Sequence, residues 1–182
     1  MSIAFKEWTL VCDALGQGAQ SIILRKGGIA EGRAGFRFQH EEFYLFPTLF
    51  HGQVSKLKLP VKTLLPEGNP NEIQINFFAR VEWTARITDL NVAQRLAPFH
   101  IWRDEVIEER FHYDGKDELH LAFLRIYRLQ TPWTFPSAPR YGGCRSWVEL
   151  AEETENFSMQ QVLSAEESVF RSEKLRELAV PV

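Results

Sequence analysis

A short basic segment followed by glycines offers the first candidate for chemistry. It consists of Arg25, Lys26, Gly27 and Gly28. Because glycine adopts positive φ without steric cost, successive backbone N–H groups there can converge on an anion while the two cations supply charge. The segment lacks the glycine–lysine–serine/threonine ending of a Walker A loop, and it lacks the GxGxxG spacing. We predict a phosphate-binding turn, and the alternative is a tight connection with two solvated cations.

Acidic and imidazole side chains flank the aromatic stretch that follows. His40 and Glu42 fall on one strand face by the period-two rule, with Glu41 between them, and Thr48 and His51 come after the stretch. A carboxylate near an imidazole can bind a metal or move protons, and a threonine hydroxyl can donate to a ligand. Ordinary polar surface positions explain the pattern as well. No metal site is therefore assigned, and a metal contact of Glu42 or His51 stays open.

Cationic and aromatic residues are interleaved through the second half of the chain. The candidates for ligand binding there are Trp102, Arg110, Arg125, Tyr141 and Trp147. Such residues suit stacking on a base and holding a phosphate. They also suit a packed core with structural ion pairs, so both interpretations stay open. Cys144 is a weaker candidate nucleophile, because no histidine lies close to it in sequence.

The composition predicts a folded, soluble protein. The chain has 182 residues, of which 45% are hydrophobic, and its net charge of −3 argues against general nucleic-acid binding through a basic surface. Of its 24 acidic and 21 basic residues, seven and three fall in 151–182. We expect one domain over 1–150 and an acidic helical tail over 151–182. No signal peptide or membrane-spanning run is recognised, so we expect a cytoplasmic location and no membrane partner.

The periodicity of apolar residues indicates the elements that position these groups. Helices are predicted over 4–15, 91–96, 104–111 and 157–178. Strands are predicted over 20–25, 43–46, 72–87, 119–129 and 146–150, with loops over 52–72 and 131–143. Asp89 or Asn91 should cap the second helix, and Glu7 should be a solvated carboxylate on the first. Together these elements predict an α+β fold: a mixed or partly closed sheet with an N-terminal helix and a C-terminal helical tail.

Several segments resemble a bacterial family known as domain of unknown function 1802. They are LRKGGI (24–29), FYLFPT (43–48) with His51, HIW (100–102), LRIYRL (124–129) and GCRSWVEL (143–150). This family has no assigned activity. More weakly, GAQSIILR (18–25) is similar to the helix-to-strand entry of ASCH domains, relatives of the PUA barrel, with Arg25 as the charged match and Gln20 in place of a lysine. That resemblance implies a small β-barrel of a kind that holds RNA or modified bases.

Three functions are consistent with these patterns. The first is a non-catalytic module that binds a nucleotide, RNA or single-stranded DNA through the basic turn and the aromatic residues. The second is a metal-dependent nuclease or other hydrolase of the restriction-endonuclease-like type, built on Glu7 with Glu41 or Glu42. The third is a protein-interaction module that docks a partner through the tail over 151–182. No catalytic residue and no cofactor is assigned, so enzymatic activity is left open.

Overall fold

The computed structural model describes residues 2–26, 36–60, 63–66, 69–151 and 157–179. Its strands are β1 (Ser2–Trp8), β2 (Ile22–Arg25), β3 (Glu42–Thr48), β4 (Glu72–Ile87), β5 (Leu119–Pro136), β6 (Trp147–Leu150) and β7 (Met159–Gln161). They form one sheet in the order β2–β5–β4–β3–β1–β6, with β7 also paired to β5. β1 and β3 run parallel and the other pairs run antiparallel. The predicted α+β class with a mixed sheet is confirmed.

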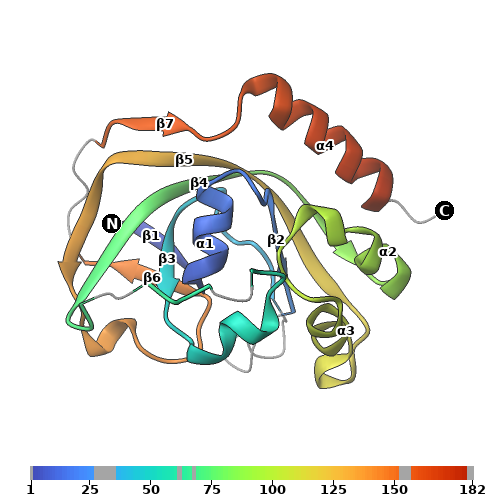
Figure 1. Cartoon of the computed structure of the whole chain (residues 1–182), viewed down its shortest axis with the longest axis horizontal. Helices are drawn as coiled ribbons and strands as arrows, with labels where there is room; N and C mark the ends of the chain where they lie inside the picture. Colours follow the sequence, from blue (N-terminus) through green and yellow to red (C-terminus); the bar gives the residue numbers. More distant parts are fainter. Residues whose placement is uncertain (1, 27–35, 61–62, 67–68, 152–156, 180–182) are drawn as a thin grey trace.

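Four α-helices pack around this sheet within the described residues. They are α1 (Thr9–Gly16), α2 (Leu90–Arg95), α3 (Asp104–His112) and α4 (Ala165–Ala179). Short 3-10 turns join several elements: η2 (His51–Lys56), η3 (Ala97–Phe99), η4 (Tyr113–Gly115) and η5 (Pro139–Tyr141). β4 and β5 are long, strongly curved strands, and α4 runs alongside β5 (Figure 1). Buried apolar residues form two clusters: the larger includes residues of all four α-helices, and the smaller consists of strand residues and Tyr141 of η5.

Two predicted elements match the structure closely. β4 spans Glu72–Ile87, as the period-two alternation indicates, and Phe77 and Ala79 are buried in the larger apolar cluster. Ile75 is buried in the smaller cluster, because the register of β4 with β5 shifts between Ile75 and Phe77. α2 begins after Asp89, whose carboxylate accepts a hydrogen bond from the Asn91 backbone N–H at 2.8 Å. That bond satisfies one of the donors that a helix leaves unpaired at its N-terminus.

The predicted helix over 4–15 is wrong in its first half. Residues Ser2–Trp8 form β1, which pairs with β3 on one side and β6 on the other. The spacing of Phe5 and Trp8 matches a helical stripe, but a strand paired at both edges and covered on both faces has no exposed side to reveal its period. Glu7 is consequently only 1% exposed, not the solvated helix carboxylate that the sequence predicts.

β5 also continues beyond its predicted end, to Pro136, and so takes the first six residues of the loop predicted over 131–143. Phe77 pairs with Arg128 and Ile75 pairs with Trp133, so residues 129–132 form a bulge opposite β4. A bulge tolerates Pro132, which has no N–H to donate to a neighbouring strand. The first part of the predicted proline-rich loop is therefore strand, and the rest contains the short turn η5.

The predicted helix over 157–178 is shorter in the structure, because β7 takes its first part. α4 begins at Ala165, after Ser164 accepts a hydrogen bond from the Glu167 N–H at 3.1 Å. Leu175 on α4 is fully buried, and the Trp83 Nε1 group donates to Ser172 Oγ at 2.9 Å. α4 therefore packs against the sheet.

Candidate ligand-binding cleft

A cleft of about 760 Å³ lies between α1, the end of β3, the start of β4 and the end of β5. This volume falls within the range typical of small-molecule sites. Its apolar lining includes Leu45, Phe46, Ile73, Phe77 and Tyr141. Its polar lining includes Lys6, Asp13, Thr48, Gln74 and Asn76. Apolar walls with a few polar groups are the usual composition of a binding site for a small organic molecule.

Lys6 places a cation at one end of the cleft. Its Nζ donates to the carbonyl oxygens of Gly142 at 3.2 Å and Gly143 at 3.0 Å, and Gly143 has a φ of +80°. Because an ammonium has three N–H donors, one is left beyond these two bonds. Burial and the nearby Arg145 lower the pKa of Lys6, and Cys144 acts in the opposite direction. The charge is thus held by the fold, with little solvent around it.

Asp13 on α1 places a carboxylate in the same cleft. The residue is half-buried, and within the described part of the chain no side chain or backbone group donates a hydrogen bond to its carboxylate. Burial raises the pKa of Asp13, and Arg128 partly offsets that shift. Arg128 itself donates to the Gly16 carbonyl oxygen at 2.6 Å and lies over the Phe77 ring. Asp13 is therefore an acceptor with unused capacity.

Local contacts explain why α1 carries Asp13 to this position. The Gln53 side chain accepts a hydrogen bond from the Leu10 N–H at 3.2 Å, which satisfies a free donor at the start of α1. Thr9 Oγ1 donates to the Thr48 carbonyl oxygen at 3.1 Å, and Thr48 Oγ1 donates to the Glu7 carbonyl oxygen at 3.0 Å. This exchange fixes α1 against the end of β3.

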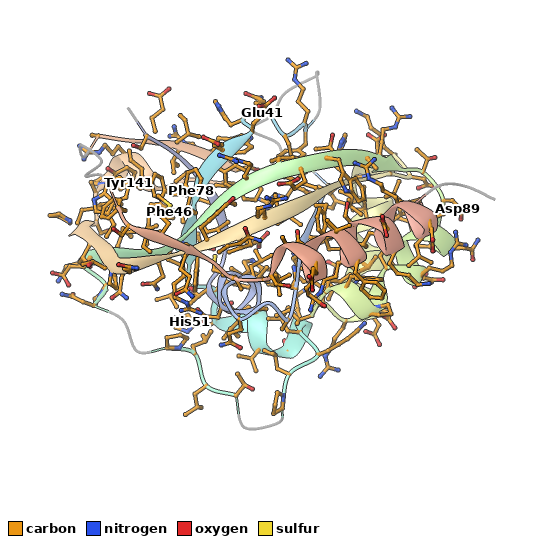
Figure 2. All side chains as sticks on the ribbon, turned by 90° about the horizontal axis from the view of Figure 1, so that it is seen from above. Glu41, Phe46, His51, Phe78, Asp89 and Tyr141 are labelled. Carbon is orange, nitrogen blue, oxygen red and sulfur yellow. The ribbon has the colours of Figure 1, made fainter. Side chains whose placement is uncertain are left out.

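Two of the predicted ligand-binding residues, Thr48 and Tyr141, line the cleft. Figure 2 shows Tyr141 close to Phe46, and the centroids of their rings are 5.7 Å apart. Tyr141 is buried, and its hydroxyl accepts a hydrogen bond from the Ala151 N–H at 3.4 Å. It contributes to the wall of the cleft and not to an exposed stacking surface.

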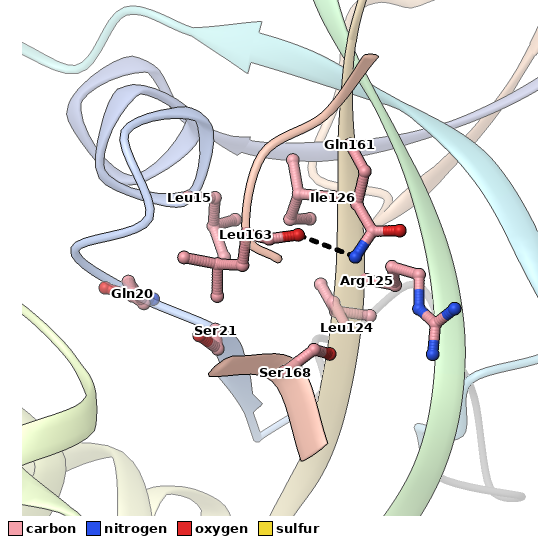
Figure 3. A pocket seen from close by; sticks show the side chains of 9 residues that line it. All are labelled: Leu15, Gln20, Ser21, Leu124, Arg125, Ile126, Gln161, Leu163 and Ser168. Carbon is pink, nitrogen blue, oxygen red and sulfur yellow. Dashed lines mark hydrogen bonds between the residues drawn. The ribbon is translucent and has the colours of Figure 1, made fainter. Parts of the chain in front are cut away.

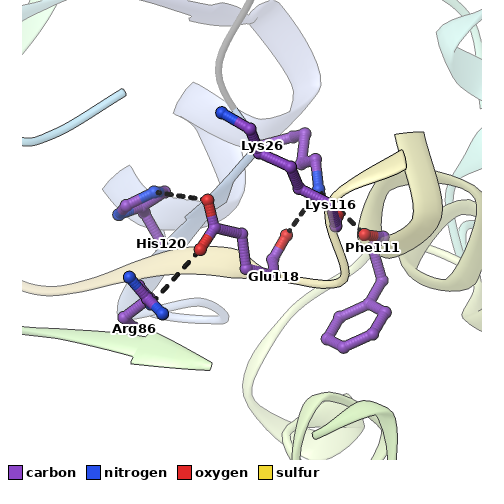
Figure 4. Close-up of polar contacts among 6 residues, drawn as sticks. All are labelled: Lys26, Arg86, Phe111, Lys116, Glu118 and His120. Atoms are coloured by element: carbon purple, nitrogen blue, oxygen red, sulfur yellow. Dashed lines mark hydrogen bonds and ion pairs between the residues drawn. The ribbon is translucent and has the colours of Figure 1, made fainter. Parts of the chain in front are cut away.

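Lys26, which belongs to the predicted phosphate-binding turn, contacts backbone carbonyl oxygens in the structure. Its Nζ donates to the carbonyl oxygens of Phe111 at 2.9 Å, Glu118 at 3.1 Å and Lys116 (Figure 4). These three bonds use all the donors of an ammonium group and hold the end of α3. Gly27 and Gly28, the other half of the predicted turn, lie outside the described residues.

The side chains of Arg110 and Trp102 contact each other inside the protein. The Arg110 guanidinium lies between two indole rings, 5.0 Å from the centroid of Trp8 and 5.0 Å from that of Trp102. Trp102 is fully buried. Burial lowers the pKa of Arg110 to about 10, and Arg25 acts in the same direction while Glu7 opposes it. Such a guanidinium–indole stack stabilises the packing of α3 on the sheet.

The remaining predicted residues lie at separate places. Arg25 donates a hydrogen bond to Ser146. The Trp147 ring packs on Phe5, with ring centroids 4.8 Å apart. His51 is exposed at the start of η2. Arg125 pairs with Glu82 at 2.9 Å and lines a small pocket beside α4 (Figure 3). That pocket has a volume of about 10 Å³, which is room for no more than a water molecule.

The predicted acidic residues do not gather around a common point. Glu42 pairs with Arg80 at 2.6 Å, and Glu41 and His51 lie far apart in Figure 2. Glu7 is opposite Pro47, towards the other end of β3 from Glu42. Among the described residues, no three His, Cys, Asp or Glu side chains come close enough to hold a metal ion. The geometry gives the hydrolase hypothesis no support.

Lys6, Asp13, Gln74 and Asn76 were missed as candidate residues by the sequence analysis. Lys6 lies on a strand that was interpreted as a helix, so its direction could not be inferred. Gln74 and Asn76 are two residues apart on the same face of β4, where their side chains hydrogen-bond at 2.9 Å. The period-two pattern of β4 could have indicated that Gln74 and Asn76 share one face of the strand.

Comparison with known proteins identifies the family. The model of domain of unknown function DUF1802 matches residues 4–173, so the chain belongs to this family. The predicted resemblance is confirmed. No curated protein matches the chain. Within the described residues, no helix has the length and apolar character needed to cross a membrane.

Among solved structures, the chain is similar to ASCH proteins from Zymomonas mobilis. One ASCH structure is 15% identical, with 100% of this chain and 97% of that chain covered and a TM-score of 0.47. A serine-to-alanine mutant of that protein is 12% identical, with 96% and 95% covered and a TM-score of 0.49. The segment GAQSIILR (18–25) showed a weaker similarity to ASCH domains, which is the family named for these structures.

Proposed function

We propose that the chain is a non-catalytic binding module whose cleft takes a ligand that contains a nucleobase. The ligand is a nucleotide or an unpaired residue of RNA or single-stranded DNA. One observation carries the proposal: the 760 Å³ cleft combines apolar walls with separated polar groups. A nucleobase presents two apolar faces and a polar edge, so it matches a site of this composition.

The polar groups suit the edge of a base. Gln74 and Asn76 carry both donors and acceptors, and Asn and Gln amides pair with the edge of adenine in known complexes. Phe46 and Phe77 supply apolar surface in the same cleft. These residues together provide contacts to the faces and to the edge of one base.

The charge of the cleft indicates that the base contributes more to binding than the phosphates do. Lys6 is the one cation among the described lining residues, and Asp13 and Glu72 are acidic. Affinity should therefore fall only slightly with salt. For one phosphate contact, we expect about a threefold loss between about 50 and 200 mM salt, whereas a groove with many phosphate contacts loses orders of magnitude.

Calorimetric titration tests the proposal with nucleosides, 5′-nucleotides, and short single-stranded RNA and DNA at about 50 mM salt. Replacing both Gln74 and Asn76 by alanine should weaken binding about tenfold, because base-edge hydrogen bonds are lost. Gln130→Ala is the matched control, since Gln130 is an exposed glutamine on β5 outside the cleft lining. Absence of binding to every one of these ligands would refute the proposal.

A further inference from the structure

The geometry points to a particular class of nucleotide for this cleft: a nucleoside monophosphate whose base carries an exocyclic amino group. In this arrangement the Lys6 ammonium donates a hydrogen bond to the phosphate. The Asp13 carboxylate accepts a hydrogen bond from the amino group of the base. This inference rests on the proposed function and narrows it to one ligand class. It follows from two opposite charges on separate elements, β1 and α1, that line one cleft.

Lys6 is prepared for a single anionic group. Two carbonyl oxygens fix its Nζ, and one N–H with the positive charge is left for a ligand. The lysine is 8% exposed and lines the cleft, so its remaining donor is accessible to a ligand there. A charge-assisted hydrogen bond in such surroundings is stronger than a neutral one. An anion at this position would also compensate the burial of the ammonium.

The number of cations limits the number of phosphates. No second Lys, Arg or His is present among the described residues that line the cleft. Further phosphate groups would find no positive partner there and would lie in a site that already holds the carboxylates of Asp13 and Glu72. A monophosphate fits this balance better than a di- or triphosphate.

Asp13 discriminates between bases by the direction of its hydrogen bonds. An ionised carboxylate only accepts, so it pairs with the amino groups of cytosine, adenine or guanine. Uracil and hypoxanthine have a carbonyl oxygen where cytosine and adenine have the amino group. Two acceptors facing each other leave a polar group without a partner and repel. The half-buried position of Asp13 makes that mismatch more costly than it would be in open water.

Matched pairs of ligands test the inference on the full chain. We expect cytidine monophosphate to bind about tenfold more tightly than uridine monophosphate, and adenosine monophosphate about tenfold more tightly than inosine monophosphate. Cytidine without phosphate should also bind about tenfold more weakly than cytidine monophosphate. The three comparisons need no variant, so they are informative even if a substitution impairs folding.

Two substitutions assign the effects to their residues. Asp13→Asn should reduce the preference for cytidine over uridine monophosphate to about twofold or less, because an amide both donates and accepts. Lys6→Met should weaken cytidine monophosphate and leave cytidine unchanged. Glu105→Gln is the control for Asp13, since it removes an exposed carboxylate on α3 outside the cleft lining and should leave the base preference unchanged.

The outcomes separate this inference from the proposed function. Equal binding of all four monophosphates, or a base preference that persists in Asp13→Asn, would overturn the ligand class and leave nucleobase binding standing. A complete lack of binding by nucleosides and nucleotides would overturn both. Tighter binding of triphosphates than of monophosphates would overturn the role given to Lys6.

Discussion

Arg25 Nη2 donates a hydrogen bond to Ser146 Oγ at 3.1 Å. Arg25 ends β2, and Ser146 directly precedes β6, the strands at opposite ends of the sheet order. The Ser146 carbonyl oxygen also accepts from the Lys6 N–H at 2.8 Å. The sheet is therefore curved enough for its two edge strands to be joined through side chains. The sheet itself stays open, because β2 and β6 do not pair with each other.

The first prediction concerns this link between the edges. Arg25→Met and Ser146→Ala should each lower the free energy of unfolding by about 1–2 kcal/mol. The double variant should lose less than the sum of the two, with a coupling of about 1 kcal/mol, because both changes remove the same bond. Urea unfolding of the four proteins measures this coupling. Strictly additive losses would show that the bond contributes nothing.

The second prediction concerns the close approach of α1 to β4. A Cβ at Gly16 would overlap three atoms of the Phe77 ring, which is buried. Gly16→Ala should therefore cost about 1–3 kcal/mol of stability through overpacking. Adding Phe77→Leu should recover part of the loss, because the smaller side chain makes room. If Gly16→Ala unfolds at the same denaturant concentration as the wild type, the Phe77 ring does not restrict the side chain at position 16.

The third prediction concerns pH. Burial lowers the pKa of His100 to about 4, with a further contribution from Lys58. In the unfolded chain the imidazole protonates near its ordinary value of 6.5, so between about pH 4 and 6.5 the unfolded state binds more protons. The contribution of His100 is therefore complete above pH 6.5 and is lost as the pH falls towards 4. Over that window it amounts to about 3 kcal/mol.

The His100→Phe variant checks this assignment. Its unfolding free energy should fall by about 2 kcal/mol less than that of the wild type between pH 7 and pH 4.5. Gln130→Ala, at an exposed residue that does not titrate, should keep the wild-type pH dependence. Parallel pH profiles for the wild type and His100→Phe would contradict the prediction.

The fourth prediction concerns α4. Leu175 is fully buried, whereas Val169 on the same helix is 53% exposed. Leu175→Ala should cost about 2–4 kcal/mol, and Val169→Ala should change stability by no more than about 0.5 kcal/mol. Hydrogen exchange of the α4 amides should accelerate in the first variant alone. Equal protection in both variants would indicate that the tail does not depend on this contact.

The sequence predicted the elements that carry a clear local pattern, and it failed at β1, where the spacing of apolar residues also matches a helix. β4 and the Asp89 cap were identified because alternation and capping are local patterns. β1 was misread because it is buried on both faces between β3 and β6. The carbonyl partners of Lys26 could not be predicted, because they lie in the last turn of α3 and in the segment after it, and no local pattern connects either to Lys26.

The cleft could not be inferred for a similar reason. Its cation is fixed by Gly142 and Gly143, which are 136 and 137 residues away from Lys6. From the sequence, Asp13 could be recognised only as a polar residue of a predicted helix. The meeting of these groups depends on the register of β1 with β3 and β6, which a single sequence does not specify.

The difference between the two cysteines gives the protein a natural attachment point for a dye. Cys144 is exposed beside Gly143, while Cys12 is buried and burial raises the pKa of its thiol. A maleimide fluorophore should consequently react at Cys144 alone. The label would lie next to the glycines that hold Lys6, so its emission would follow occupancy of the cleft without any engineered residue.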